Sequence, residues 1–201
     1  MKDIITEGYW DHRYEEMDTP WDIGYANEGL VDLVMQYFDN EDKLLIPGAG
    51  IGHEAAMLFQ MGFRNVHICD WAPHAVSAMH NKYPDFPESN IIINDFFKLD
   101  EKFDGIIEQT FLCALPVEQR PAYAEKCRQL LNENGRYTGV LFSKTFPFDG
   151  PPFGGSIEEY RDLFNEQFNI ERLEEWEGSI KPRKGSECIL VMVPGKSVKI
   201  L

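Results

Sequence analysis

Short apolar runs alternate with amphipathic stretches from Leu44 onward. Apolar runs of about 4–8 residues between turn residues are typical of buried strands, whereas apolar residues three and four positions apart are typical of helices. The runs predict seven strands, at residues 43–47, 65–70, 90–94, 103–109, 136–142, 169–176 and 186–193.

Three amphipathic stretches predict helices, each with one apolar face to bury. The stripe before the first strand consists of Leu30, Leu33, Val34, Tyr37 and Phe38. Residues 117–131 place on one face Tyr123, Ala124, Cys127, Leu130 and Leu131. Gly135 is expected to end this second helix. The third helix begins with a capping box of Ser156 and Glu159, and its apolar face consists of Ile157, Tyr160, Leu163, Phe164 and Phe168.

This alternation predicts an α/β fold with a mostly parallel sheet and helices on both faces. No helix fits between Trp176 and Ser186, so the last two strands are expected to form an antiparallel C-terminal hairpin. A seven-stranded sheet that ends in such a hairpin resembles the Rossmann-like fold of class I methyltransferases. The 201 residues are expected to form a single domain, residues 1–201.

Acidic residues outnumber basic ones by 34 to 19, which gives a formal charge of −15. Nucleic acid and anionic membranes bind through Lys and Arg, so neither is an expected partner. No apolar run approaches the length of about 20 residues that crosses a bilayer, and the first residues do not resemble a signal peptide. Four widely spaced cysteines predict reduced, buried thiols, and we expect a cytoplasmic monomer or weak homodimer.

The stretch LLIPGAGIGHE, residues 44–54, brings Gly48, Gly50 and Gly52 together after the first predicted strand. Ligands of open α/β sheets bind at this edge, where a bare backbone allows close approach. A dinucleotide site has a third glycine at the position that His53 occupies, so the spacing favours S-adenosylmethionine. A purely structural turn is an equally good interpretation of the glycines alone.

Two acidic residues follow the next two predicted strands. Asp70 can accept hydrogen bonds from ribose hydroxyls, or it can cap the helix that starts near Pro73. Asp95 can receive an adenine amino group, while the ring of Phe96 covers the base.

Several motifs occur in an order that matches one family. They are YWDHRYEEMDTPWDIG, LLIPGAGIGHE, IIEQTFLCALP, the GPPF loop and PRKG. Together they span residues 10–187, and the chain resembles the thiopurine S-methyltransferase family, in particular its thiol and halide methyltransferase branch. The resemblance implies that residues 1–40 form an N-terminal lid and helix, which fold over S-adenosyl-L-methionine.

Carried over by position, the resemblance implies a set of cofactor contacts. They are Trp10, Tyr14, Trp21, Gly48, Gly50, Asp70, Trp71, Asp95, Phe96 and Gln109. Gln109 departs from the tyrosine that relatives can carry beside the cofactor. Without the resemblance, the N-terminal aromatic residues are more simply interpreted as a plug of the core.

Methyl transfer from a sulfonium is an in-line displacement that needs positioning and exclusion of water. We therefore expect no metal and assign no catalytic acid or base, since a thiol is partly ionised at neutral pH. The residues expected to line the acceptor pocket are Trp21, Phe111, Phe153 and Arg183. Arg183 has a solvated loop arginine as its alternative, and Cys113 is interpreted as a structural thiol rather than a nucleophile.

The predicted function is transfer of a methyl group to a small soft nucleophile, which is a thiol, hydrosulfide, thiopurine-like compound or halide. Relatives carry a longer, histidine-containing version of the FDGPPF loop, so the acceptor stays open. The alternatives are a non-catalytic S-adenosylmethionine-binding sensor or partner-binding protein, and a methyltransferase for an oxygen or nitrogen acceptor. A nicotinamide oxidoreductase is disfavoured by His53.

Overall fold

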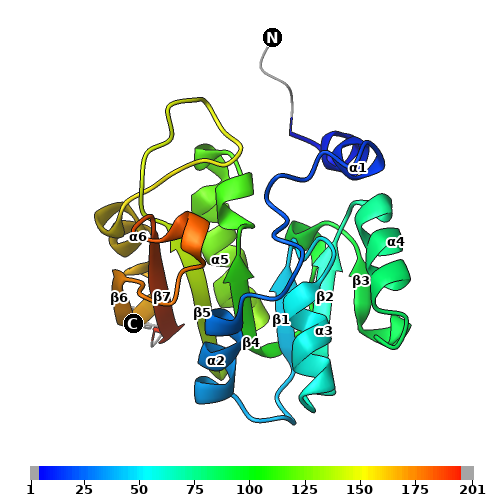
Figure 1. The fold of residues 1–201 in the computed structure, drawn as a ribbon. Coiled ribbons are helices and arrows are strands. Elements are labelled where there is room, and N and C mark those ends of the chain that lie inside the picture. Colours follow the sequence, from blue (N-terminus) through cyan, green and yellow to red (C-terminus); the bar gives the residue numbers. More distant parts are fainter. Residues whose placement is uncertain (1–4, 196–201) are drawn as a thin grey trace. The chain divides into compact units, whose positions relative to one another are not determined.

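The structure is a computed structural model that describes residues 5–195 (Figure 1). Its strands form one seven-stranded sheet in the order β3-β2-β1-β4-β5-β7-β6. The predicted α/β fold with an antiparallel C-terminal pair is confirmed. The chain divides into two compact units, residues 1–99 and 100–201, and each is described by itself.

The first unit contains the parallel strands that carry the glycine turn. Its elements are α1 (Glu7–Glu15), α2 (Glu28–Tyr37), β1 (Leu44–Pro47), α3 (His53–Gln60), β2 (Val66–Asp70), α4 (Pro73–Lys82), η1 (Glu88–Asn90), β3 (Ile91–Ile93) and η2 (Phe96–Lys98). Strand β2 lies between β1 and β3, with Leu44 opposite Val66 and Ile68 opposite Ile91. Helices α3 and α4 pack on β2, so the turns that precede these two helices are anchored to a buried strand.

The second unit contains the antiparallel end of the sheet. Its elements are β4 (Phe103–Gln109), η3 (Leu112–Ala114), η4 (Val117–Gln119), α5 (Arg120–Leu130), β5 (Leu131–Phe142), α6 (Ile157–Phe164), β6 (Phe168–Glu175), η5 (Lys181–Arg183) and β7 (Glu187–Pro194). Strands β4 and β5 are parallel, and β7 runs antiparallel to both β5 and β6. Because β7 has a strand on each side, almost all of its residues are buried. In the edge strand β6, less exposed and more exposed residues alternate along most of its length.

Burial follows the predicted helix faces. The buried members of the three stripes are Leu30, Leu33, Val34, Phe38, Tyr123, Ala124, Cys127, Leu130, Leu131, Tyr160, Phe164 and Phe168. Ser156 accepts a hydrogen bond from the Glu159 backbone at 3.2 Å, which confirms it as the N-cap of α6. The apolar patterning therefore identified the core of each helix.

Two boundary predictions are wrong. Strand β5 begins at Leu131, where the backbone becomes extended, so Gly135 lies inside a strand instead of ending a helix. A side chain at Gly135 would meet the backbone oxygen of Asp104 at 3.0 Å, which explains the glycine without a helix stop. Phe168 belongs to β6, and its ring packs on Phe164 with centroids 6.0 Å apart.

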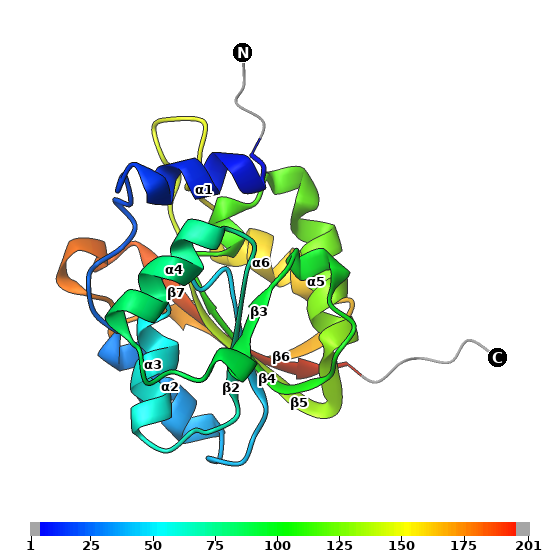
Figure 2. The same cartoon turned by 90° about the vertical axis from the view of Figure 1, so that its right-hand side faces the viewer.

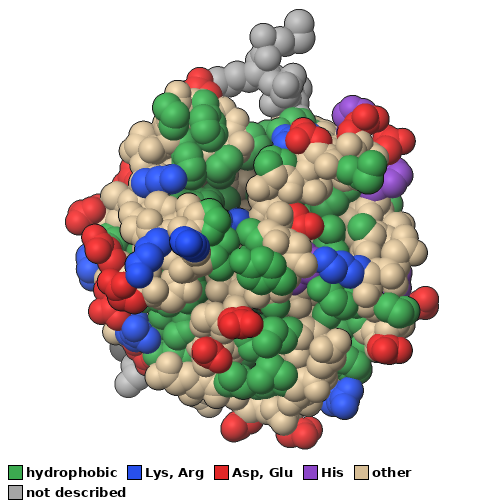
Figure 3. Space-filling view, in the orientation of Figure 1, with side chains coloured by type: hydrophobic (Ala, Val, Ile, Leu, Met, Phe, Trp, Pro, Cys, Tyr) green, Lys and Arg blue, Asp and Glu red, His purple; other side chains and the backbone are tan. Residues whose placement is uncertain are grey.

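No helix among residues 5–195 is long and apolar enough to cross a membrane. Acidic side chains are spread over the face that Figure 3 presents, in keeping with the formal charge of −15.

Candidate functional site

The turn after β1 is built from glycines in the left-handed region. Gly48, Gly50 and Gly52 have φ values of 57°, 56° and 68°, which other residues adopt only with strain. The Gly48 N–H donates to Cys69 O at 2.7 Å, which joins the turn to β2. The sequence GAGIG therefore specifies a fixed loop between β1 and α3.

The space that the missing side chains leave is occupied by the protein itself. A Cβ at Gly50 would collide with the phenolic oxygen of Tyr14, and one at Gly52 would meet Met79 Cε at 2.7 Å. Approach of a ligand to this backbone stays a prediction, because Tyr14 already accounts for the absence of a side chain at Gly50.

Asp70 ends β2 and holds the turns on either side of it. Its Oδ2 accepts from Gly50 N at 2.9 Å, and its Oδ1 accepts from Ala72 N at 2.9 Å. Burial raises the pKa of this carboxyl, although the backbone N–H groups of Ala72 and Gly50 oppose the rise. Each oxygen retains acceptor capacity, so these backbone contacts and the predicted ribose acceptor are compatible roles. The N-cap of α4 is Ala72, without a side-chain hydrogen bond, so Asp70 is not the helix cap of the alternative interpretation.

The aromatic residues of the N-terminal segment contact one another. Trp21 lies edge to face with Trp10 and Tyr14, with ring centroids 5.3 and 5.7 Å apart, and Trp21 Nε1 donates to Tyr14 Oη at 3.1 Å. The guanidinium of Arg13 lies 4.9 Å from the Trp21 ring centroid. All three predicted aromatic residues are half-buried rather than enclosed, and α1 contributes no buried residue. They therefore form a cover at the surface and not a plug of the core.

A cavity of about 300 Å³ lies at the end of β3. Its lining residues are Glu7, Trp71, Pro73, Ile93, Asn94, Asp95 and Lys98. Asp95 caps η2 by accepting from Phe97 N at 2.9 Å, and its other oxygen lies 3.7 Å from Lys98 Nζ. Phe96 is 4% exposed and does not line this cavity, whereas Ile93 is 59% exposed and does. The sequence analysis did not single out Ile93, because its exposure at the end of β3 is visible only in the structure.

In the second unit, the predicted residues cluster around the turn after β4. Gln109 ends β4, and its Oε1 is buried with no hydrogen-bond partner among the described residues. Phe153 N donates to Cys113 O at 2.6 Å, which holds the GPPF loop against η3. Arg120 reinforces this contact, since its Nη2 donates to Phe153 O at 3.3 Å and to Gly154 O at 2.8 Å. The sequence analysis missed Arg120 because its partners lie more than thirty residues away.

Arg183 is a half-buried cation beside an aromatic ring. Its guanidinium lies 5.5 Å from the Phe142 ring centroid, and Nη1 lies 3.6 Å from Glu187 Oε1. The side chain is 12% exposed, so it is not the solvated loop arginine of the alternative interpretation. Burial raises the pKa of Glu187, an effect that Ser179 and Arg183 oppose.

Glu108 is a buried acid that the sequence analysis did not single out. Its Oε1 accepts from Phe111 N at 2.7 Å and Leu112 N at 2.9 Å, and its Oε2 accepts from Tyr123 Oη at 2.6 Å. Burial raises its pKa to about 7, although these three hydrogen bonds oppose the rise. The available signal was an acidic residue directly after the apolar pair Ile106 and Ile107 near the end of a predicted strand.

Cys113 has the properties of a structural thiol. Burial, followed by the charge of Glu108, raises its pKa to about 12, and Sγ donates to Thr110 O at 3.2 Å. All four cysteines are buried and free. Cys113 therefore stays protonated at neutral pH.

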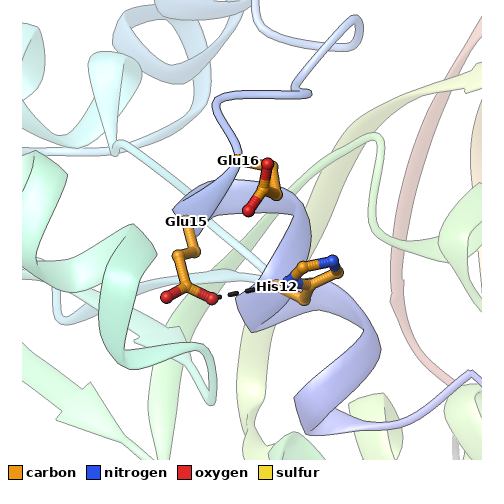
Figure 4. A group of neighbouring side chains, drawn as sticks. All are labelled: His12, Glu15 and Glu16. Carbon is orange, nitrogen blue, oxygen red and sulfur yellow. Dashed lines mark hydrogen bonds and ion pairs between the residues drawn. The ribbon is translucent and has the colours of Figure 1, made fainter.

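Among residues 5–195, one group of side chains that could hold a metal ion lies at the C-terminal end of α1: His12, Glu15 and Glu16 (Figure 4). His12 and Glu15 point toward one another, with Nδ1 and Oε2 3.4 Å apart, and Glu16 lies beside them. All three are exposed, as surface pairs one helical turn apart commonly are. The expectation that no metal is used stays a prediction.

A sequence model of the thiopurine S-methyltransferase (TPMT) family matches residues 5–194. The chain belongs to this family. It is 29% identical over 195 residues to thiocyanate methyltransferase 1 of Brassica oleracea, an alignment that covers 93% of this chain and 85% of the relative. It is 36% identical over 177 residues to thiopurine S-methyltransferase of Vibrio campbellii (strain ATCC BAA-1116), with 78% and 80% covered.

A solved structure shares the fold of this family member. It is 1,6-didemethyltoxoflavin-N1-methyltransferase of Burkholderia thailandensis with bound 1,6-didemethyltoxoflavin and S-adenosylhomocysteine, at a TM-score of 0.72 and 17% identity. The superposition covers 94% of this chain and 87% of the other. The predicted class I fold is confirmed, and the chain is an S-adenosylmethionine-dependent methyltransferase.

Proposed function

We propose that this enzyme methylates a small soft nucleophile that is already anionic when it reacts: a thiolate, hydrosulfide, thiopurine-like compound or halide. The observation that carries the proposal is the chemistry around the turn after β4. Glu108 and Cys113 are buried there and form hydrogen bonds within the protein. The cationic groups nearby are the guanidinium of Arg120, which is bonded to the GPPF loop, and that of Arg183, which lies beside the Phe142 ring.

The available titratable groups argue against an acceptor that must lose a proton to the enzyme. Both oxygens of Glu108 accept hydrogen bonds and the residue is fully buried, so it has no access to an incoming alcohol. The thiol of Cys113, with its pKa of about 12, is no better as a base. An acceptor that is ionised before binding needs neither group, and Arg183 provides a positive charge to attract it.

Residues of the first unit provide groups that suit S-adenosylmethionine. The carboxylate of Asp70 retains acceptor capacity at the end of β2, and the cavity at the end of β3 is lined by Trp71 and Asp95. When bound, S-adenosylmethionine supplies a methyl group that its sulfonium has already activated. The protein's task is then to orient the reactants and exclude water.

The proposed contacts follow the motif positions. For the cofactor they are Trp10, Tyr14, Trp21, Gly48, Gly50, Asp70, Trp71, Asp95, Phe96 and Gln109. For the acceptor they are Trp21, Phe111, Phe153 and Arg183. The buried Oε1 of Gln109 supports its inclusion, because it has no hydrogen-bond partner within residues 5–195 and a ligand that donates to it would satisfy a costly buried acceptor. Phe96 has the weakest support, since it is buried away from the cavity.

The names of the relatives support the soft-nucleophile class, because they include thiocyanate, thiol and thiopurine methyltransferases. An oxygen or nitrogen acceptor is the second candidate. The proposal extends to a single domain that acts in the cytoplasm as a monomer or weak homodimer and does not bind nucleic acid. Reduced cysteines and the charge of −15 support this setting.

The test is a panel of acceptors with labelled methyl donor: bisulfide, thiophenol, thiocyanate, iodide, catechol and an aromatic amine. We expect labelled product from the soft anions and none from catechol or the amine. The variant Arg183→Gln should raise the KM for the anionic acceptors about tenfold, since an interaction with a charged group is worth about 1.5 kcal/mol. Its affinity for S-adenosylmethionine should not change.

The matched control is Arg172→Gln, which removes a guanidinium paired with Glu174 on the edge strand β6. It should leave the KM values within about twofold, as expected of a surface ion pair. Product from catechol but not from bisulfide or iodide would overturn the proposal. Equal KM changes in both arginine variants would remove Arg183 from the acceptor site.

A further inference from the structure

The segment of residues 21–27, called the strap below, follows α1 and precedes α2. It is tied to two helices by side chains from outside the segment. Lys82 Nζ, at the end of α4, donates to Gly24 O at 2.8 Å. Glu54 Oε1, in the first turn of α3, accepts from Asn27 N at 2.9 Å. These ties fix the path of the strap after Trp21.

A third tie comes from a buried imidazole. His53 is the first residue of α3, is 7% exposed, and uses both ring nitrogens. Its Nε2 lies 2.7 Å from Asp22 Oδ1, and its Nδ1 lies 2.6 Å from Tyr83 Oη. A carboxylate only accepts, so Nε2 carries a proton, and in the neutral ring Nδ1 accepts from the Tyr83 hydroxyl. His53 thus bridges the strap and the end of α4.

The residue that His53 holds, Asp22, is next in the chain to the aromatic residue Trp21. Asp22 follows Trp21 in the chain, and its Oδ1 also accepts from Gly24 N at 2.7 Å, which fixes the local turn. Trp21 Nε1 donates to Tyr14 Oη at 3.1 Å, and the Tyr14 oxygen occupies the space over Gly50. The position of both rings therefore depends on where the Asp22 carboxylate is held.

A second anchor lies on the other side of these rings. Asp11 of α1 accepts from the His74 backbone N–H at 2.8 Å, and its other oxygen lies 2.9 Å from His74 Nδ1. As Figure 2 shows, α1 lies beside the N-terminal end of α4. Tyr14 and Trp21 lie in the sequence between this anchor and the His53 bridge, so the segment that carries them is held at both ends.

We propose that His53 is a positioning residue for methyl transfer, which acts by clamping Asp22 and so holding Trp21 and Tyr14 over the glycine turn. The inference rests on the proposed function, in which these two rings contact the cofactor. His53 occupies the position where a dinucleotide site has its third glycine, and its imidazole here is aimed at the strap. Its effect on the reaction is indirect, through the geometry of two aromatic side chains.

The test compares His53→Phe, which keeps a ring but removes both hydrogen bonds, with wild type by calorimetric titration of S-adenosylmethionine. We expect the Kd to rise about 2- to 30-fold, the range that corresponds to losing a cation over an aromatic ring. The KM for the cofactor should rise by a similar factor, with kcat reduced less. The matched control is His80→Phe on the last turn of α4, which should change the Kd less than about twofold.

A double-mutant comparison separates positioning from a general loss of stability. In a Trp21→Ala background, His53→Phe should add little to the Kd, because its effect passes through Trp21. Asp22→Ala cuts the same bridge from the strap and serves if His53→Phe does not fold; it should give the same rise in Kd. Faster hydrogen exchange at the Gly24 amide should accompany either change, since that amide donates to Asp22.

The outcomes are distinct from those of the acceptor panel. A wild-type Kd retained by both His53→Phe and Asp22→Ala would overturn the inference, as would effects of His53→Phe that remain undiminished in the Trp21→Ala background. These results do not depend on which acceptor is methylated. Conversely, wild-type enzyme that binds the cofactor but methylates no soft nucleophile would refute the proposed function while the Kd series still decides the role of His53.

Discussion

The buried carboxyl of Glu108 makes the stability of this enzyme depend on pH. The perturbation that reveals it is Glu108→Gln. The backbone N–H groups of Phe111 and Leu112 both donate to one oxygen of Glu108, Oε1. The side-chain amide of glutamine has an oxygen that can take this place. The amide NH₂ can donate to Tyr123 Oη, whose proton can then turn toward Tyr137 Oη, 3.2 Å away. The substitution therefore removes the titration and preserves the hydrogen bonds.

The sign follows from the raised pKa. Below pH 4.5, Glu108 is protonated in both the folded and the unfolded chain, and its favourable contribution is fully present. As the pH rises toward the folded pKa of about 7, the unfolded chain ionises first, so the free energy of unfolding falls. A rise in pKa from 4.5 to about 7, at about 1.4 kcal/mol per pH unit, corresponds to about 3 kcal/mol.

The assay is urea unfolding of wild type and Glu108→Gln at intervals from pH 4.5 to 8.5. The difference between the two proteins cancels the other titrating groups. We expect wild type to lose about 3 kcal/mol relative to the variant across this range. Tyr123→Phe should extend the loss to higher pH, because it removes a hydrogen bond that favours the ionised form. A difference that stays constant within about 0.5 kcal/mol would refute the argument, since Glu108 would then titrate as an exposed acid does.

Two further predictions concern the first unit. Gly50→Ala should lower the free energy of unfolding by more than the roughly 1–2 kcal/mol of left-handed strain, because its Cβ collides with Tyr14. Gly185→Ala is the control for strain alone, at φ +74° with open space around it, and equal losses in urea unfolding would contradict the collision. Asp11→Asn should bring the pKa of His74 down from its raised value, measured by NMR titration, because the hydrogen bond that the His74 ring donates to the Asp11 carboxylate is the main cause of the rise. The stabilisation that His74 gives is fully present below its ordinary pKa of 6.5, as long as Asp11 is ionised, and it is lost as the pH rises through the raised pKa. An unchanged His74 titration in Asp11→Asn would contradict the contact.

Strand positions were predictable where a parallel strand buried on both faces is a continuous apolar run, and LLIP stands out as such. The start of β5 was not predictable from the same signal. Residues 131–136 contain four polar or charged residues and a glycine, and Leu131 continues the helical stripe of α5. It pairs with Phe103, whereas the regular register resumes only at Arg136, so tertiary pairing overrides the local pattern.

Residues of the candidate site were predictable only where a sequence motif lies at the end of a predicted strand. Asp70 and the glycine turn are such cases, and the structure links them through one hydrogen bond. The bridge of Asp22, His53 and Tyr83 joins residues about thirty positions apart and has no periodic or motif signal. A histidine after a glycine turn indicates nothing by itself, because its partners are determined only when the chain folds back.

Asp70 and Glu108 end or nearly end their strands, and each uses its carboxylate first to hold the backbone of the loop that follows. The two residues differ in how the backbone N–H donors are distributed over the two carboxylate oxygens. The N–H groups of Gly50 and Ala72 bond to different oxygens of Asp70, so Asp70→Asn must turn an NH₂ group toward one of these donors. We therefore expect Asp70→Asn to lower the free energy of unfolding by about 1–3 kcal/mol, whereas Glu108→Gln keeps its loop. Loss of cofactor affinity in Asp70→Asn would then combine a displaced glycine turn with a lost ribose acceptor. An Asp70→Asn protein as stable as wild type, yet unable to bind S-adenosylmethionine in calorimetry, would show instead that the carboxylate acts on the ligand alone.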